Sequence, residues 1–225
     1  MSSILTRTLI AAATLALAGA ASADTLKLTG FSFSTSAMPD VSVKLDLPHT
    51  ANDKSYSGEA GQFTGKLNGA SFTTYCMDIY QGISFGTTYT YSAPQDLANA
   101  TKANDIGRLL TKYLVGVDTA KESTAMQLAL WEILYETTSS YDLTKGVFTE
   151  SKNNSGVRTL ANTWLHDLGT TNSYKVQVLV NRDHQDQLFI SAATQPVPEP
   201  ASYALMAAGL GAIGFVARRR RPNAS

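Results

Sequence analysis

The chain has 225 residues, with 18 Lys plus Arg, 18 Asp plus Glu and a single Cys. This length suits one domain, or at most two small ones, with a hydrophobic core of its own. A net charge of zero and a charged fraction of 16% exclude a strongly basic nucleic-acid binder and an acidic disordered chain. One thiol can form neither an internal disulfide nor a Cys-rich zinc site.

The first 23 residues have the pattern of a secretory signal peptide. Arg7 lies in a short polar start, an apolar run extends from Leu9 to Ala18, and an Ala-Ser-Ala triplet ends at Ala23. Small residues suit signal peptidase, and the apolar run is too short for a retained membrane helix. We therefore predict export, with cleavage between Ala23 and Asp24.

The exported body begins with a strand-rich region that extends from Thr25 to about Tyr91. It is rich in Thr, Ser, Val, Phe, Tyr and Gly, and the residues from Val41 to Leu47 alternate between apolar and polar. Polar punctuation at 48–55, 58–61 and 68–69 separates several such runs. This pattern predicts a small antiparallel barrel or sandwich.

Helical spacing follows the strand-rich region. The first apolar stripe extends from Ile106 to Leu114, and Thr119 with Glu122 predicts a capping box for a helix that extends to about Glu136. A third helix is predicted from Val157 to Leu168, before Gly169. Strands at 174–180 and 187–192, joined by a polar turn, close the domain. We predict an α+β domain over 24–193, with an inserted helical portion and a closing β-hairpin.

The single cysteine lies in a strand-like stretch from Thr73 to Tyr80. As a strand, this stretch would place Cys76, Asp78 and Tyr80 on one face and the residues between them on the other. An unpaired Cys in an exported protein invites oxidation or unwanted disulfides. The thiol is therefore expected either to be buried and inert or to be chemically engaged.

A second unusual residue is Gln127, in the predicted helix that ends near Glu136. This helix is apolar almost all round, which indicates burial on most sides. A buried amide without partners costs about 1 to 3 kcal/mol. Gln127 therefore needs a specific partner in the core.

Together these stretches resemble the Cys-Gln thioester domains of bacterial surface proteins. Those domains carry an aromatic-Cys stretch on a strand and, later, a Gln-x-Ala-aliphatic-Trp stretch on a helix. The matching positions here are Tyr75-Cys76 followed by Asp78, and the run from Gln127 to Trp131 with Ala129 at its centre.

The resemblance implies a thioester between the sulfur of Cys76 and the side-chain carbonyl carbon of Gln127, formed with loss of ammonia. A thiolate is both a good nucleophile and a good leaving group, and a dry setting protects the acyl centre from water. An amine or hydroxyl on a target would then be acylated by Gln127. The reaction is single-use, so the protein would be a covalent anchor and not an enzyme. Tyr75, Asp78, Ala129, Trp131 and Glu132 are the expected pocket residues.

Simpler interpretations stay open. Cys76 and Trp131 are also ordinary core residues, and Gln127 could hydrogen-bond a strand edge, in a non-covalent structural or carbohydrate-contacting matrix module. A Cys-dependent hydrolase would need a base from His49, His166 or His184, and each of these has an ordinary surface interpretation.

No metal or cofactor is predicted. Asp183, His184 and Asp186 crowd one turn, but neighbouring residues of a hairpin rarely converge on an ion. The chain has no glycine-rich phosphate loop of the required spacing.

The C-terminal segment has the features of a second targeting signal. A linker at 194–200 ends in Pro198-Glu199-Pro200, an uncharged run covers 201–217, and Arg218, Arg219, Arg220 and Arg221 follow. Seventeen helical residues rise about 25 Å, a minimal span, and the arginines would stay on the cytoplasmic side. We take the sorting helix and its Arg-rich end as residues 201–225. This order of features resembles the PEP-CTERM sorting signal of Gram-negative bacteria. In that family a membrane peptidase, exosortase, acts near the triplet.

Removing these ends changes the charge. Arg7 and the four terminal arginines are five of the 18 basic residues, which leaves 13 against 18 acidic residues between Asp24 and Glu199. The exported body is therefore about five units negative, which argues against adhesion to anionic polymers by charge alone. The expected partners are signal peptidase, an exosortase-like peptidase and a surface or matrix target that bears a nucleophile, with transient membrane insertion through 201–217 and no nucleic acid. The expected location is the cell surface or extracellular matrix of a Gram-negative bacterium, reached through an inner-membrane intermediate.

Overall fold

The computed structural model describes residues 23–47 and 53–193. Almost all of the predicted signal peptide, the linker at 194–200 and the C-terminal segment at 201–225 lie outside the described residues. The described chain combines strands and helices, and the predicted α+β class is confirmed.

Within the described residues, ten strands form three antiparallel sheets. The four-stranded sheet has the order β5-β4-β1-β6, and the other two have the orders β10-β9-β7 and β3-β2-β8. The strands are β1 (Asp24–Phe31), β2 (Asp40–Leu45), β3 (Lys54–Glu59), β4 (Phe63–Leu67), β5 (Ala70–Thr74), β6 (Thr88–Tyr91), β7 (Gln95–Asp96), β8 (Phe148–Glu150), β9 (Tyr174–Leu179) and β10 (Gln187–Ala192). Within the described ranges the sheets do not close into a barrel, so the arrangement is sandwich-like.

The predicted strand signals hold where one face is buried. In β2, Val41, Val43 and Leu45 are all at most 2% exposed, as the alternation predicted. Asn68 and Gly69 both have positive φ, at 51° and 83°, and join β4 to β5 as a two-residue hairpin turn.

The first two helices begin at side-chain caps. Asn99 caps α1 (Ala100–Tyr113), and Thr119 with Glu122 forms the predicted capping box of α2 (Ala120–Tyr135). The stripe predicted to continue the first helix to Leu114 ends instead in a 3-10 turn, Leu114–Gly116. The third helix, α3 (Val157–Leu165), is also shorter than predicted, because the chain tightens at its end and Asp167 N–H donates to the carbonyl of Trp164.

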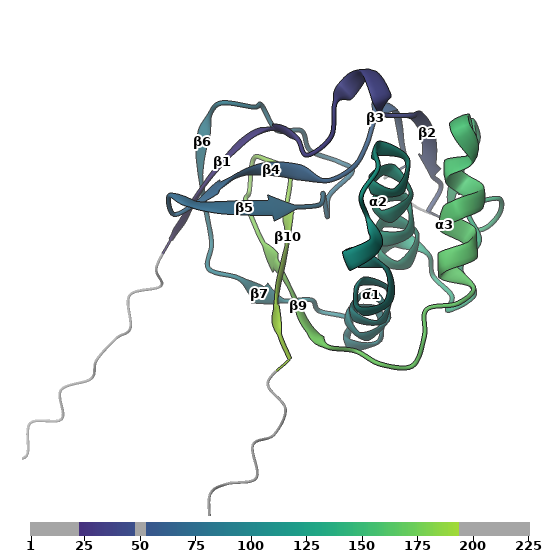
Figure 1. Cartoon of the computed structure of the whole chain (residues 1–225). Coiled ribbons are helices and arrows are strands. Elements are labelled where there is room, and N and C mark those ends of the chain that lie inside the picture. The colour runs from purple at the N-terminus through teal and green to yellow at the C-terminus, as the bar shows by residue number, and fades with distance from the viewer. Residues whose placement is uncertain (1–22, 48–52, 194–225) are drawn as a thin grey trace, which may run out of the picture.

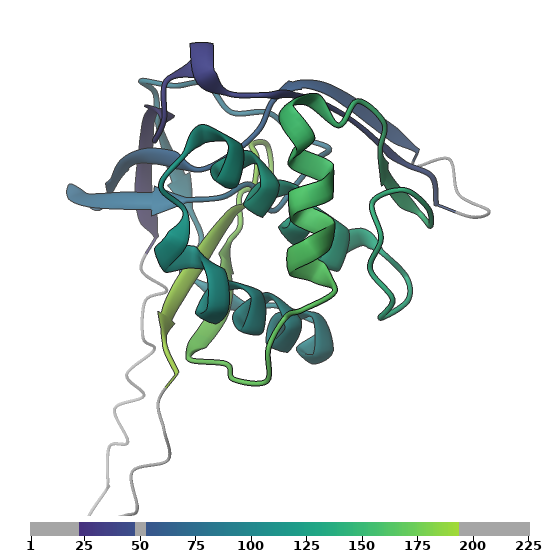
Figure 2. The same cartoon turned by 45° about the vertical axis from the view of Figure 1, so that its right-hand side comes forward.

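The helices lie on one side of the four-stranded sheet, and the β9–β10 hairpin lies between this sheet and the helices (Figures 1 and 2). Helix α2 packs against both α3 and α1, and twelve of its sixteen residues are buried. Side chains from all three sheets join it in one continuous core. Burial on nearly every side explains why this helix shows no polar face.

The stretch around the cysteine differs from the predicted strand. Strand β5 ends at Thr74, and Cys76 makes a single antiparallel bridge to Gln187 of β10. Tyr75, Cys76, Met77 and Ile79 are all at most 5% exposed. The prediction of a two-faced strand to Tyr80 is wrong because this segment crosses between the sheets and is covered on both sides.

Gly65 in β4 illustrates how closely the four-stranded sheet is packed. A Cβ at this position would collide with the carbonyl oxygen of Lys27 and lie 2.7 Å from Cα of Leu28, beside the bulge in β1. Because both atoms belong to the backbone, they cannot rotate away. We expect Gly65→Ala to lower the free energy of unfolding by about 2 to 3 kcal/mol in urea denaturation. Gly69→Ala, in open space at the turn, tests the separate cost of its positive φ.

Candidate functional site

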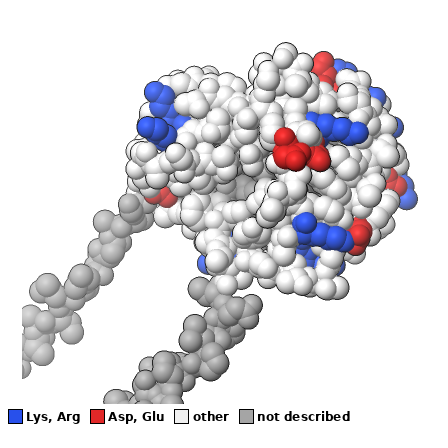
Figure 3. Space-filling view, in the orientation of Figure 1, with Lys and Arg blue, Asp and Glu red and all other residues white. Residues whose placement is uncertain are grey.

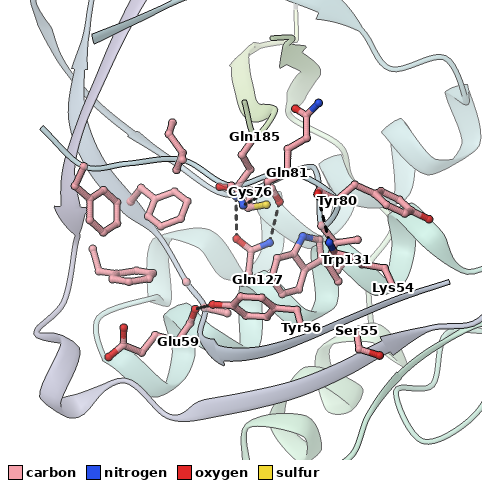
Figure 4. Close-up of a pocket in the computed structure, with 18 residues that line it drawn as sticks. Lys54, Ser55, Tyr56, Glu59, Cys76, Tyr80, Gln81, Gln127, Trp131 and Gln185 are labelled. Carbon is pink, nitrogen blue, oxygen red and sulfur yellow. Dashed lines mark hydrogen bonds between the residues drawn. The ribbon is translucent and has the colours of Figure 1, made fainter. Parts of the chain in front are cut away.

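Cys76 and Gln127 lie side by side in the core. The backbone N–H of Cys76 donates to Oε1 of Gln127 at 2.9 Å, and Nε2 of Gln127 donates to the backbone carbonyl of Cys76, also at 2.9 Å (Figure 4). Gln127 is 1% exposed and comes from the middle of α2, 51 positions further along the chain. The amide therefore pairs with Cys76 as a neighbouring strand would.

The thiol of Cys76 is buried at 2% exposure and is free of any disulfide. Its Sγ donates to the backbone carbonyl of Asp78 at 2.9 Å, and the backbone N–H of Asp78 approaches the sulfur at 3.3 Å. Burial raises the pKa of the Cys76 thiol well above its usual range, and the Asp78 backbone partly opposes this. Trp131 also acts to lower this pKa, although its Nε1 has no hydrogen-bond partner among the described residues.

A pocket of about 460 Å³ opens onto this pair. Cys76, Gln127 and Trp131 line it together with Tyr56 of β3, whose ring meets that of Trp131 edge to face with centroids 6.0 Å apart. Figure 4 shows Gln127 between the Cys76 stretch and the Tyr56 ring. The other lining residues are Phe31, Lys54, Ser55, Glu59, Ala60, Gly61, Phe63, Ile79, Tyr80, Gln81, Gly82, Ile83, Phe85 and Gln185.

The pocket lining combines apolar and polar side chains. The rings of Phe31, Phe63 and Phe85 contact one another with centroids 5.0 to 5.7 Å apart, and Phe85 is 43% exposed. Gln81 and Gln185 are among the polar residues of the lining. Such a lining suits a molecule that carries both apolar and hydrogen-bonding groups.

The other expected pocket residues take different places. Tyr75 and Ala129 are buried in the core without lining the pocket, and Asp78 lines a second cavity of about 390 Å³ with Tyr135. Glu132 is fully buried away from the pocket, where its Oε1 accepts from the backbone N–H of Asp142 at 2.7 Å. Of the expected set, Trp131 alone lines this pocket with Cys76 and Gln127, while Asp78 contacts the Cys76 sulfur through its backbone.

Several pocket residues were not anticipated from the sequence. Tyr56, Gln81 and Gln185 lie 20, 5 and 109 positions from Cys76, and only the fold brings them together. Alternation in β3 could have suggested that Tyr56 faces inward, since it is less exposed than Ser55 and Ser57. No local pattern marks Gln185.

The histidines lie elsewhere. His166 is exposed at the end of α3, the ring of His184 packs on Tyr89 with centroids 4.0 Å apart, and His49 is outside the described residues. Neither described histidine lines the pocket. In the turn after β9, Asp186 accepts from the backbone N–H of Asn181, and within 23–47 and 53–193 no group of His, Cys, Asp and Glu is arranged to hold a metal ion.

Comparison with protein families identifies a sorting motif in the C-terminal part of the chain. Residues 196–221 match the PEP-CTERM protein-sorting motif, which includes the Pro-Glu-Pro triplet and the terminal arginines. No curated protein and no solved structure matches the chain significantly. Among the described residues no helix is long and apolar enough to cross a membrane, and 201–217 lies outside them. The motif indicates an exported cell-surface protein that is sorted by exosortase.

Proposed function

We propose that this exported protein attaches covalently to a surface or matrix target through a thioester between Cys76 and Gln127. The observation that carries the proposal is the direct pairing of the two residues at the base of a pocket. Export through signal peptidase, with cleavage after Ala23, belongs to the same proposal. So does an extracellular matrix around a Gram-negative cell as the destination.

The bond would form by acyl transfer within the chain. The thiolate sulfur of Cys76 attacks Cδ of Gln127, the C–N bond breaks, and ammonia leaves with the proton that the thiol gave up. The Cys76 N–H already donates to Oε1 of Gln127, where negative charge develops during attack. Burial disfavours the Cys76 thiolate, so the attack needs this hydrogen bond to the carbonyl oxygen. Burial also keeps water away from the thioester once it has formed.

The pocket then provides the route for the target. An amine or hydroxyl attacks the same carbon, the C–S bond breaks, and the sulfur recovers a proton as the thiol. The target remains joined to Gln127 through an amide or an ester. Trp131 and Tyr56 would flank the entering group.

Intact mass of protein purified without amines tests the proposal. The expected mass is lower than that of the unmodified chain by one ammonia, and methylamine should remove the deficit by adding to Gln127. Cys76→Ala and Gln127→Ala should each show the full mass with no methylamine adduct. A full mass with a titratable thiol in freshly prepared protein, without hydrolysis during purification, contradicts the thioester.

A non-covalent matrix module is the second candidate. It is favoured by the two hydrogen bonds between Gln127 and the Cys76 backbone and by the contact of Sγ with the Asp78 backbone, both of which suit a structural role. In that case the pocket would contact carbohydrate through its aromatic rings and amides. The same mass measurement separates the two candidates, since this one requires an unmodified Gln127.

A further inference from the structure

The outer face of the four-stranded sheet carries two lysines directly opposite each other. Lys27 of β1 pairs in register with Lys66 of β4, and both side chains are exposed. Neither lysine forms an ion pair among the described residues, whereas Lys44 and Lys175 are paired with Asp46 and Asp96. Like charges in this position destabilise a sheet, so the arrangement suggests a use outside the fold.

The pair belongs to a row that crosses the whole sheet. Lys66 is opposite Ser71 of β5, and Lys27 is opposite Thr88 of β6, so the row reads Ser71, Lys66, Lys27, Thr88. All four residues are exposed. At the usual strand spacing the row spans about 14 Å. It therefore offers two cations flanked by hydroxyls along one line.

No acidic residue within 23–47 and 53–193 forms an ion pair with the lysines of this row. The acidic residue of β1, Asp24, alternates to the opposite face and accepts a hydrogen bond from Nδ2 of Asn68. Figure 3 shows blue side chains at the upper left, over the four-stranded sheet, on a mostly uncharged surface, with red atoms on that side only lower down, where the grey trace begins. The body as a whole is acidic, so this is a local positive patch.

We propose that the row Ser71-Lys66-Lys27-Thr88 is a docking surface for an acidic polysaccharide. Charge complementarity to carboxylates or sulfates comes from the two ammonium groups, and Ser71 and Thr88 add hydroxyls that can hydrogen-bond to sugar hydroxyls. Further exposed hydroxyls at Thr25, Thr73 and Thr90 extend the same polar face. The described strands present no aromatic ring on this face, which favours a polar, charged chain over an apolar ligand.

Retention on immobilised polygalacturonate tests this surface, with neutral dextran as the comparison. The protein should bind the acidic polymer at about 0.02 M salt and be released at about 0.5 M, where charges are strongly screened. Lys27→Gln/Lys66→Gln should bind roughly tenfold or more weakly, because it removes both cations of the row. Its melting temperature should be equal to or above that of the parent, since the mutual repulsion is removed.

The matched control is Lys44→Gln/Lys175→Gln, which removes the same two charges from ion-paired positions. Equal loss in both variants, or undiminished binding by the first, overturns the proposal. Tighter binding to vesicles that contain phosphatidylserine than to polygalacturonate overturns it as well, in favour of a membrane. Cys76→Ala should bind the polymer normally, so failure of the thioester and failure of this surface are distinguishable.

Discussion

Replacing Gln127 with Ala is expected to lower the free energy of unfolding by about 3 to 5 kcal/mol. Relative to the chain with an intact Gln127 amide, the substitution leaves both backbone groups of Cys76 without their partner, and Cys76 is only 2% exposed. It also leaves a cavity in the core beside α2, because the side chains around Gln127 are buried. Each unsatisfied buried group costs about 1 to 3 kcal/mol, and the cavity adds to this cost.

Urea denaturation followed by far-UV circular dichroism measures the effect as a shift in midpoint at constant slope. Cys76→Ala is the matched control, because it removes the sulfur but keeps the backbone groups that Gln127 satisfies. Its expected loss is about 1 to 2 kcal/mol. A Gln127→Ala protein as stable as Cys76→Ala would show that the amide does not hold this segment in place.

Gln127→Glu separates hydrogen bonding from volume. The carboxylate can accept from the Cys76 N–H, but it must be protonated to donate to the Cys76 carbonyl. We expect a stability between those of the parent and Gln127→Ala, improving as the pH falls. A pH-independent loss would contradict the two-point pairing.

Local signals in the sequence predicted the elements that are governed by neighbouring residues. The capping box at Thr119 and Glu122, the alternation of β2 and the bounds of β10 all depend on contacts within a few positions or on one buried face. Gln127 was identifiable for the same reason, since it is a lone amide in an otherwise apolar stretch of helix. These predictions needed only periodicity and the chemistry of single side chains.

The site needed long-range information. The segment around Cys76 lies against β10, more than 100 positions later, and this contact ends the predicted strand early. The same contact places Gln185 beside the pocket, while β3 brings Tyr56 from the other direction. The sequence could indicate that Cys76 and Gln127 are unusual, but the walls around them depend on how three sheets assemble.

Glu132 shows a different gap between sequence and structure. Glu132, which follows Trp131 in α2, was expected to line the pocket. Its side chain is instead fully buried elsewhere in the core, and its Oε2 has no hydrogen-bond partner among the described residues. Burial, reinforced by Glu136 and Asp142, raises the pKa of this carboxyl to about 8. It is therefore protonated at neutral pH in the folded protein.

This raised pKa predicts a stability that falls with pH. In the unfolded chain Glu132 ionises near pH 4.5, whereas in the folded chain it keeps its proton to about pH 8. The folded state therefore binds more protons between these values, and its stability declines as the pH rises through this window. Below about pH 4.5 both states are protonated and the penalty disappears.

Glu132→Gln should remove that decline. Glutamine is neutral at every pH and keeps an oxygen to accept the N–H of Asp142. We expect the variant to exceed the parent by on the order of 2 to 4 kcal/mol at pH 8, and by little at pH 4.5. Thermal or urea denaturation at a series of pH values measures the difference.

Glu150→Gln is the control with the opposite expectation. Glu150 is also buried, at 1% exposure, but its carboxylate accepts from the backbone N–H groups of Ser42, Lys152 and Asn153. Arg158 lies 3.9 Å from the same group. Replacing this satisfied carboxylate should destabilise the protein, since an amide nitrogen cannot accept those hydrogens. If Glu132→Gln also lowered the stability at pH 8, the Glu132 carboxyl would have to be ionised and stabilised as a charge in the folded protein. That result would contradict a pKa raised by burial.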